Sequence, residues 1–555
     1  MDQRTSPPTR RTRPRDRSRA LLAALILAPF LGADAADAQR EPERKKAEVP
    51  LERRGPDVWA LTGARIVVAP GRVVEDGTLV IADGKIRAAG AAVETPAGAR
   101  EVPLEGKTLF PGFIDSYLPR SWPKEKLPPQ GGSATPRVHP ERDLSFHAFD
   151  GAIAKTHRRA GFTTALVVPA DGVIRGQSAL VNLGDGGLGK NLLRGRVAQH
   201  FRLEGTRERI YGRSLMGAMA LVRQTLLDAG HYGRIRHRAE GRRLAFDRSL
   251  EALAAALASH QPSVFETEKL LDAGRAARLA EEFELDLWLV GNGHEYKRLA
   301  QVVATGAPIL LPLDFLEPPE VGDEGDDLSV KLEDLRHWDR APENPIALLD
   351  AGVTFAITPF RQSSPRELFE DLAAARERGM TEDQLLAALT TIPARLLGLE
   401  PSAGTLEAGK MANLLVVDGE LWTEKPKILD VWIDGRRYPQ RSAKAPAMDP
   451  TGEWRLTLRL GDEGEPPEIL LRLAGTPEEL TGQVEAGNFV LDLSSALLSG
   501  STLEVVYDGA RIGAPGSVTL ELELEGDRAR GKGLGPSGEF EVEGRRVPDR
   551  AEGAP

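Results

Sequence analysis

The sequence predicts an α/β protein built on a (β/α)8 TIM barrel, with β-rich chain on both sides of it. Between residues 113 and 400, short apolar runs alternate with stretches of helical periodicity, as such a barrel requires. Before this region, β-branched runs are separated by turns. Residues 447–548 alternate apolar and polar positions between regular turns, which predicts an extra all-β domain of antiparallel strands at the C-terminus.

Length and composition set the broad class of protein. A chain of 555 residues is too long for one core and suggests two or three domains. The net charge of −10 is spread through the chain, and no basic stripe follows the N-terminus, which argues against nucleic acid as a partner. Because cysteine is absent, a thiol nucleophile, a disulfide framework and thiolate metal ligands are all excluded.

Residues 1–38 predict an export signal. Arginines recur from Arg10 to Arg19, a short apolar run follows over residues 20–32, and Ala36-Asp37-Ala38 is a small-residue cleavage site. The apolar run is well short of the roughly 20 residues needed to cross a bilayer. An uncleaved amphipathic anchor is the alternative. We expect an exported protein, periplasmic or extracellular, with no membrane span after signal removal and a charged linker over residues 39–55.

Individual elements of the barrel follow from the same patterns. Residues 249–260 and 270–283 have helical periodicity, which predicts two helices. A short apolar strand follows each of them. Thr381, followed by acidic residues, is a typical N-cap and begins a late helix. The expected barrel strands after the first are 162–169, 195–202, 263–266, 285–291, 307–312 and 353–359.

Three stretches resemble one known family. Lys107–Asp115, within EGKTLFPGFIDSYLPRSW, is similar to the GKxxxPGFIDxHxH segment of the amidohydrolase superfamily. TIPARLLGL (391–399) and GTLEAGKMANLLVVDG (404–419) resemble the end of that family's barrel and its returning strands, with Asn413 where Asp is usual. The resemblance is to imidazolonepropionase-like, composite-domain members. It implies a small β-sandwich made of residues 56–112 and 401–440, which flanks a barrel over 113–400.

The same resemblance implies where metal ligands would lie. The family uses HxH on strand one, Lys or Glu on strand four, His on strands five and six, and Asp on strand eight, and these side chains hold ions that activate water. No lysine occurs between Lys190 and Lys269 to serve strand four. The other ligand positions hold Tyr117 and Pro119 on strand one, Glu266 on strand five, and Thr358 and Pro359 on strand eight. We therefore predict no metal ligands and no cofactor, with zinc only in an atypical site.

Four residues are candidates for catalysis: Glu266, Glu268, His294 and Asp115. Residues two apart on a strand point to the same side, so Glu266 and Glu268 could act together as acid and base. His294 follows strand six by a few residues, and Asp115 ends the first strand's apolar run. The alternative is that the two glutamates are solvated at a loop end and that His294 is a satisfied loop histidine.

Three functions remain open. Residues 160–183 and 211–234 are similar to exported bacterial amidohydrolase-like proteins, some of which pair a metal-less barrel with a metal-bearing one. The resemblance implies hydrolysis of C–N bonds other than peptide bonds, or, with a degenerate metal site, a pseudoenzyme. Such a pseudoenzyme would be a binding or partner subunit of a metal-bearing paralogue or a homo-oligomer. The second reading is an active, divergent hydrolase of an unknown small amide or cyclic amide. The third is an envelope- or polymer-binding protein that acts through the C-terminal β domain.

Overall fold

The computed structural model describes residues 58–121, 138–144, 151–185, 188–203, 214–238, 245–318, 330–440, 447–459, 466–476, 479–509, 512, 517–535 and 538–547. The expected export signal (1–38) and linker (39–55) lie outside these residues. In the part of the chain that is described, no helix has the length and apolar character needed to cross a bilayer.

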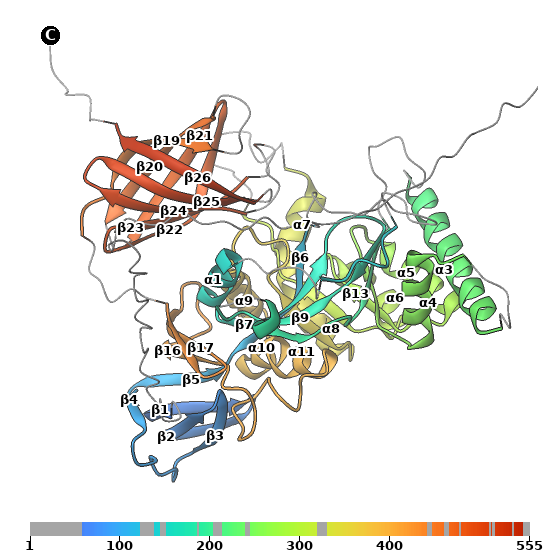
Figure 1. The fold of residues 1–555 in the computed structure, drawn as a ribbon, viewed down its shortest axis with the longest axis horizontal. Helices are drawn as coiled ribbons and strands as arrows, with labels where there is room; N and C mark the ends of the chain where they lie inside the picture. Colours follow the sequence, from blue (N-terminus) through green and yellow to red (C-terminus); the bar gives the residue numbers. More distant parts are fainter. Residues whose placement is uncertain are drawn as a thin grey trace, which may run out of the picture. The chain divides into compact units, whose positions relative to one another are not determined.

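Strands from both sides of the central region form one mixed sheet of eight strands (Figure 1). Strand β5 connects its two halves because it pairs in parallel with β1 and antiparallel with β16. Trp59 and Trp432, from opposite ends of the chain, meet edge-on with ring centroids 5.2 Å apart. The strands are β1 (Trp59–Ala69), β2 (Arg72–Ala82), β3 (Lys85–Gly90), β4 (Arg100–Pro103), β5 (Lys107–Pro111), β16 (Leu414–Asp418), β17 (Lys427–Ile433) and β18 (Arg436–Pro439).

The β-sandwich expected here is not confirmed, since the backbone pairing gives one sheet in the order β18-β17-β16-β5-β1-β2-β3, with β4 on β1. Alternating apolar residues predict that a strand is half-buried, and they do not say how many sheets the strands form. Strand β1 pairs with β2 along its whole length, and it also pairs with β4 at its start and with β5 further along. One continuous sheet results.

The central region has mostly parallel strands in two sheets. The shorter sheet has the order β10-β9-β7-β6, and the longer one β15-β14-β13-β12-β11-β8. Successive strands from β11 to β15 pair in parallel, as do β6 and β7. The strands are β6 (Phe113–Arg120), β7 (Phe162–Pro169), β8 (Ile174–Gln177), β9 (Ala179–Asn182), β10 (Leu192–Arg194), β11 (Gln199–Arg202), β12 (Ser263–Glu266), β13 (Leu287–Val290), β14 (Ile309–Pro312) and β15 (Phe355–Thr358).

Helices alternate with these strands along the chain, which confirms the mixed α/β class. Thr381 caps α10 as expected: its hydroxyl accepts a hydrogen bond from the Gln384 N–H, and the Gln384 side chain accepts one from the Thr381 N–H. The α-helices are α1 (Gly151–Arg159), α2 (Leu188–Asn191), α3 (Leu215–Arg238), α4 (Arg248–Ala258), α5 (Asp272–Phe283), α6 (Leu299–Val303), α7 (Leu332–Arg340), α8 (Asn344–Asp350), α9 (Leu368–Glu377), α10 (Glu382–Leu389) and α11 (Thr391–Leu396), and the 3-10 helices include η3 (Glu295–Arg298) and η5 (Ala341–Glu343).

Contacts at both edges join the two central sheets. The chain passes from β8 in one sheet to β9 in the other through Ser178 alone, and the Ser178 N–H donates to the carbonyl of Ala198 at 3.0 Å. On the other side, the Thr358 hydroxyl of β15 donates to Asp115 Oδ1 of β6 at 2.7 Å. Apolar side chains from both sheets, Tyr117 and Leu166 from one and Val264 and Leu310 from the other among them, pack in one buried cluster.

The C-terminal residues form a closed antiparallel barrel of eight strands (Figure 1). Each strand pairs with the next, and β19 pairs with β26 to close it, with Trp454 opposite Arg546. The interior is filled by apolar side chains such as Trp454, Leu471, Val505 and Leu520. The expected antiparallel all-β fold is therefore a barrel. Its strands are β19 (Gly452–Arg459), β20 (Glu468–Thr476), β21 (Glu479–Ala486), β22 (Phe489–Ser499), β23 (Thr502–Asp508), β24 (Ser517–Glu525), β25 (Arg528–Gly535) and β26 (Gly538–Arg546).

Candidate functional site

A buried network of charged and phenolic groups lies where β6, β8 and β12 come together. The Tyr117 hydroxyl donates a hydrogen bond to Glu266 Oε2 at 2.6 Å. The Arg175 Nη1 donates to the same carboxylate oxygen at 2.6 Å and to the Tyr117 hydroxyl at 2.9 Å. All three side chains are at most 4% exposed. Such a charge-assisted triangle holds each side chain in one position.

The electrostatics of this triangle keep Glu266 ionised. Burial alone would raise the pKa of Glu266, but the positive charges of Arg175 and Arg202 outweigh it and lower the pKa to about 2. Burial raises the pKa of Tyr117 well above its usual 10, and the adjacent Glu266 charge raises it further. Burial would lower the pKa of Arg175, but Tyr117 and Glu266 more than compensate and raise it. Arg175 and Glu266 are therefore a buried ion pair, and Tyr117 is a neutral phenol.

Arg202 extends the network toward solvent. Arg202 and Glu266 are the last residues of the neighbouring parallel strands β11 and β12 and lie opposite each other in the register. The Arg202 Nε is 3.3 Å from Glu266 Oε1, and its Nη2 donates to Glu268 Oε1 at 2.8 Å. Arg361 lies on the other side of Glu268, with its Nη2 3.5 Å from Oε2 and 3.3 Å from the carbonyl of Thr267.

The surroundings shift the pKa values of Glu266 and Glu268 in opposite directions. Burial raises the pKa of Glu268, and a hydrogen bond shared with Glu266 raises it further. The neighbouring arginines hold the pKa of Glu266 down. A proton shared between the two carboxylates therefore resides on Glu268, which is half-buried, while Glu266 stays charged beneath it. Pairs of this kind are typical of acid–base sites, and they also occur in structural ion-pair networks.

Asp115 lies at the inner end of the network. Its Oδ1 accepts hydrogen bonds from the Tyr117 N–H at 3.0 Å and from the Thr358 hydroxyl at 2.7 Å. Its Oδ2 is 3.3 Å from Nε2 of His157, whose other ring nitrogen is 3.0 Å from the carbonyl of Ile153. Asp115 is fully buried and therefore positions the backbone of Tyr117.

His294 belongs to a different group of contacts. Its ring stacks on that of His337 with centroids 3.9 Å apart, and His337 Nδ1 is 3.0 Å from the hydroxyl of Tyr296. Burial, with the nearby charges of Lys297 and Arg361, lowers the pKa of His294. Of the four predicted residues, Asp115, Glu266 and Glu268 thus lie on one chain of hydrogen bonds and ion pairs, and His294 contacts His337 instead.

The imidazole ring of His200 lies close to Tyr117 of the triangle. It is 1% exposed, and neither ring nitrogen meets a partner among the residues that the structure describes. Its ring centroid is 5.9 Å from that of Tyr117. Burial and the Arg175 charge lower the pKa of His200 to about 3, so its imidazole is neutral. The side chain fills space in the interior as an uncharged ring.

Comparisons with known proteins find similarity to one family. A family model described as the amidohydrolase family matches residues 344–438. An imidazolonepropionase from Rhizorhabdus wittichii is 27% identical over 380 residues, which span 63% of this chain and 89% of that relative. A crystal structure of an amidohydrolase from Thermotoga maritima shares the fold with a TM-score of 0.58 and 24% identity, over 68% of this chain and 99% of that one.

Together, these matches support membership of the chain in the amidohydrolase superfamily. The resemblance seen in the sequence is thereby confirmed. The matched residues 344–438 include the last strand pair of the small sheet, so the returning segment is part of the similarity.

The residues at the superfamily's ligand positions do not fit a divalent ion in this chain. Within the described ranges, no three His, Asp or Glu side chains form a group that could hold a metal. Tyr117 and Glu266 instead bind the guanidinium of Arg175, and the Thr358 hydroxyl binds Asp115. Pro119, at the second histidine position of strand one, has no donor atom.

Sequence reasoning missed the three arginines and His200. Arg175 lies in the apolar stretch VIRGQSALVN, and a charge within such a stretch needs a buried partner. That was the one available signal. It does not identify the partners, because Tyr117 and Glu266 are 58 and 91 residues away along the chain. Arg202 follows His200 on a strand that was expected, and its direction follows from the period of two.

Proposed function

We propose that this chain is an exported amidohydrolase-fold protein with a degenerate metal site, which acts without the superfamily's metal centre as a binding or partner subunit. The observation that carries the proposal is the Arg175 guanidinium, hydrogen-bonded to both Tyr117 and Glu266. These two residues are at positions where the superfamily places metal ligands. An internal cation therefore takes the charge-balancing role of the ion.

The two central sheets together make the (β/α)8 barrel of this proposal. The single-residue connection at Ser178 and the Thr358–Asp115 hydrogen bond join the sheets on either side. The shared cluster of apolar side chains then fills the barrel interior. In such a barrel, Glu266 and Arg202 lie at the C-terminal strand ends, where barrel proteins keep their sites.

Electrostatics support a metal-free site. An ion bound to the Tyr117 and Glu266 oxygens would lie beside a guanidinium that stays charged at any ordinary pH. Two positive charges repel strongly in a buried place where water does not screen them. Arg175, Arg202 and Arg361 already surround Glu266 and Glu268, so an added cation would meet three guanidinium groups there.

The partner in this proposal is a metal-bearing amidohydrolase paralogue or a second copy of the chain. Its support is the sequence similarity of residues 160–183 and 211–234 to exported amidohydrolase-like proteins that work in pairs. The periplasm or the extracellular space is the proposed location, on the strength of the N-terminal pattern of arginines, apolar residues and a small-residue cleavage site.

A second candidate function is supported by the pKa values of the two glutamates. In a divergent amidohydrolase acting on an amide or cyclic amide, water would add to the carbonyl carbon and Glu268 would protonate the leaving nitrogen as the C–N bond breaks, since its pKa is raised and it is partly accessible. The added water would then return a proton to Glu268. Glu266 would stabilise positive charge beside it, and Asp115 would position Tyr117. His294 would contribute only after a movement away from His337.

Metal analysis separates the two candidates. The protein from Gln39 onward is incubated with zinc or manganese, dialysed and measured by mass spectrometry of the metals, and then assayed on a panel of amides and lactams. The first proposal expects substoichiometric metal and no turnover. Turnover that is lost in Glu268→Gln but retained in Glu282→Gln, a surface control on α5, would establish the second. One equivalent of tightly bound metal would refute the first.

A further inference from the structure

Arg361 is held in a strained backbone conformation. Its φ is +84°, in the left-handed region that favours glycine. Its side chain forms an ion pair with Glu268, in which Nη2 is 3.5 Å from Oε2, and a hydrogen bond of 3.3 Å to the carbonyl of Thr267. Such strain costs more free energy than a partly exposed ion pair of this length typically contributes. Strained residues persist mostly at active sites and ligand clamps, so Arg361 indicates a ligand.

The side chain of Arg361 reaches across the ends of several strands. Arg361 follows β15, whereas Thr267 and Glu268 follow β12, and β13 and β14 lie between these two strands in the sheet. Arg202, the last residue of the strand on the other side of β12, has its Nη2 2.8 Å from Glu268 Oε1. The strands from β11 to β15 are parallel, so these side chains all come from C-terminal strand ends. Two arginines from different sides thus meet at one carboxylate.

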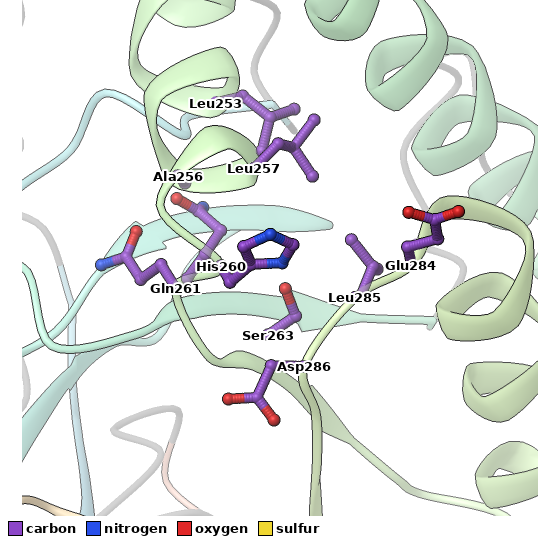
Figure 2. A pocket seen from close by; sticks show the side chains of 10 residues that line it. Leu253, Ala256, Leu257, His260, Gln261, Ser263, Glu284, Leu285 and Asp286 are labelled. Carbon is purple, nitrogen blue, oxygen red and sulfur yellow. The ribbon is translucent and has the colours of Figure 1, made fainter.

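The two ends of β12 differ in how far a ligand could reach them. Ser263, its first residue, lies beside a hollow near the ring of His260 (Figure 2). That hollow has room for about one water molecule. At the other end, the side chains of Arg202, Arg361 and Glu268 are 30%, 25% and 26% exposed. A solute can therefore reach the arginines from solvent.

Glu268 shows which group the two arginines are placed to bind. Its carboxylate presents one oxygen to each guanidinium, Oε1 to Arg202 and Oε2 to Arg361. Glu268 lies beyond the end of β12, and its side chain can rotate into solvent and leave its own volume to a carboxylate from outside. Burial and a hydrogen bond with Glu266 raise the pKa of Glu268, so its carboxyl group is a weaker partner for arginine than an ionised ligand.

The surroundings of the arginines limit the charge of the ligand and suit an apolar body. Glu266 stays ionised 3.3 Å from Arg202. Asp314 lies near Arg361, whose charge offsets part of the rise that burial causes in the pKa of Asp314. A ligand with more than one negative charge meets these carboxyl groups as well. The guanidinium of Arg361 lies over the ring of the half-buried Phe360, 5.2 Å from its centroid, which places an aromatic surface beside the site.

We propose that Arg202 and Arg361 bind the carboxylate of a small, singly charged organic acid, which displaces the side chain of Glu268 from between them. The inference rests on the proposed function, because it states what a metal-free site of this kind binds. The guanidinium groups that would repel a metal ion attract an anion. Binding forms no covalent bond and uses the room that Glu268 leaves.

Benzoate and benzamide are the probes, used on the full chain at low ionic strength. Saturation-transfer NMR should detect benzoate with a Kd of about 1 mM, as expected for a ligand with so few non-hydrogen atoms. Benzamide has the same ring and a similar shape without the charge, and it should bind at least about tenfold more weakly. Acetate should displace benzoate at a lower concentration than inorganic phosphate does. The reverse order would assign the site to tetrahedral oxyanions and overturn the carboxylate.

Arg361→Gly is the decisive variant, because a ligand-binding role and a structural role predict opposite results. Glycine adopts a φ of +84° without strain, so the ligand-free variant should melt no lower than the unchanged protein. Its affinity for benzoate should fall at least about tenfold. Arg378→Gly is the matched control, since Arg378 also pairs with two carboxylates, those of Asp339 and Glu343 at 3.1 and 3.3 Å. It should bind benzoate as the unchanged protein does.

Glu268→Ser tests the displacement. It removes the carboxylate that competes with the ligand and should bind benzoate about tenfold more tightly. Affinity that is equal or weaker in this variant would show that the ligand does not take the place of Glu268, and the proposal would fail.

The remaining results that overturn the proposal are equally direct. One is the same benzoate affinity in Arg361→Gly as in the unchanged protein, or no binding to the unchanged protein at about 50 mM. Another is an Arg361→Gly protein that does not fold or melts more than about 2 °C lower, since Arg361 would then hold the structure together. A protein that binds neither benzoate nor metal loses this inference and keeps the proposed function. One equivalent of bound metal removes the proposed function and, with it, the basis of this inference.

Discussion

Replacing Arg175 with methionine should destabilise the central region severely. The substitution leaves Arg202, at 3.3 Å, as the positive charge beside the buried Glu266, and it removes the guanidinium's hydrogen bonds to Tyr117 and Glu266. Breaking a buried ion pair on one side typically costs about 3–5 kcal/mol. The pKa of Glu266 gives a similar figure, since the fall from its usual 4.5 to about 2 corresponds to about 3 kcal/mol of interaction with the charges around it.

The same substitution should change how stability depends on pH. Because the pKa of Glu266 is lowered in the folded protein, its contribution is present above pH 4.5 and is lost as the pH falls toward 2. Without Arg175 the pKa of Glu266 rises, so less stability is left to lose in that window. Urea unfolding at pH 7 and at pH 3, followed by circular dichroism, measures both quantities, and the variant should show the smaller difference.

Two further variants serve as controls for Arg175→Met. Arg223→Met removes an exposed partner of Glu282 and should cost less than about 1 kcal/mol. The double variant Arg175→Met with Glu266→Gln removes both charges and should recover much of the loss, because an uncharged pair leaves no buried ion. An Arg175→Met protein as stable as Arg223→Met would show that Arg175 does not hold the charge of Glu266, and the reasoning about the site would fail.

Three further outcomes are expected. Thr358→Val should lower the free energy of unfolding, measured in urea, by about 1–3 kcal/mol, because it removes one hydrogen bond to the buried Asp115 Oδ1. A change below about 0.5 kcal/mol would argue against a link between the sheets. Gly176→Ala should lower the melting temperature strongly or prevent folding, because the φ angle of Gly176 is +118° and a Cβ there would lie 2.6 Å from the carbonyl oxygen of Arg142. An unchanged melting temperature would contradict this placement of the backbone. Burial, with the charge of Asp314, raises the pKa of Asp371 to about 7, so its contribution is greatest below pH 3.8 and is lost as the pH rises through 7. Asp371→Asn should therefore gain stability at pH 8 relative to the unchanged protein, and a loss of stability there would show that the carboxylate is needed in its charged form.

Local patterns were enough for most elements of the fold. FTTALVVP predicted β7 to the residue, and Thr381 with Gln384 predicted the start of α10. Such features depend on neighbours in the chain, which a sequence shows directly. Whether the C-terminal strands form a sandwich or a barrel depends on the pairing of β19 with β26, and alternation within each strand does not contain that information.

The candidate site was predictable only in part. Glu266 and Glu268 were expected to act together from their spacing, but β12 ends at Glu266, and Arg202 is what joins them. Tyr117 was seen as a lost ligand, whereas its role in the structure is to bind Arg175 and Glu266. These contacts join β6, β8 and β12, and the sequence alone offers no measure of which distant side chains meet.

The pairing of β5 with β16 determines how the protein behaves after proteolytic cleavage. These strands come before and after the central region, and Lys107 and Asp418 at their ends form an ion pair at 2.8 Å. A single proteolytic cut anywhere between residues 121 and 400 therefore produces two fragments that remain hydrogen-bonded to each other through this sheet. Nicked protein should stay together on a gel-filtration column at neutral pH and separate only in denaturant.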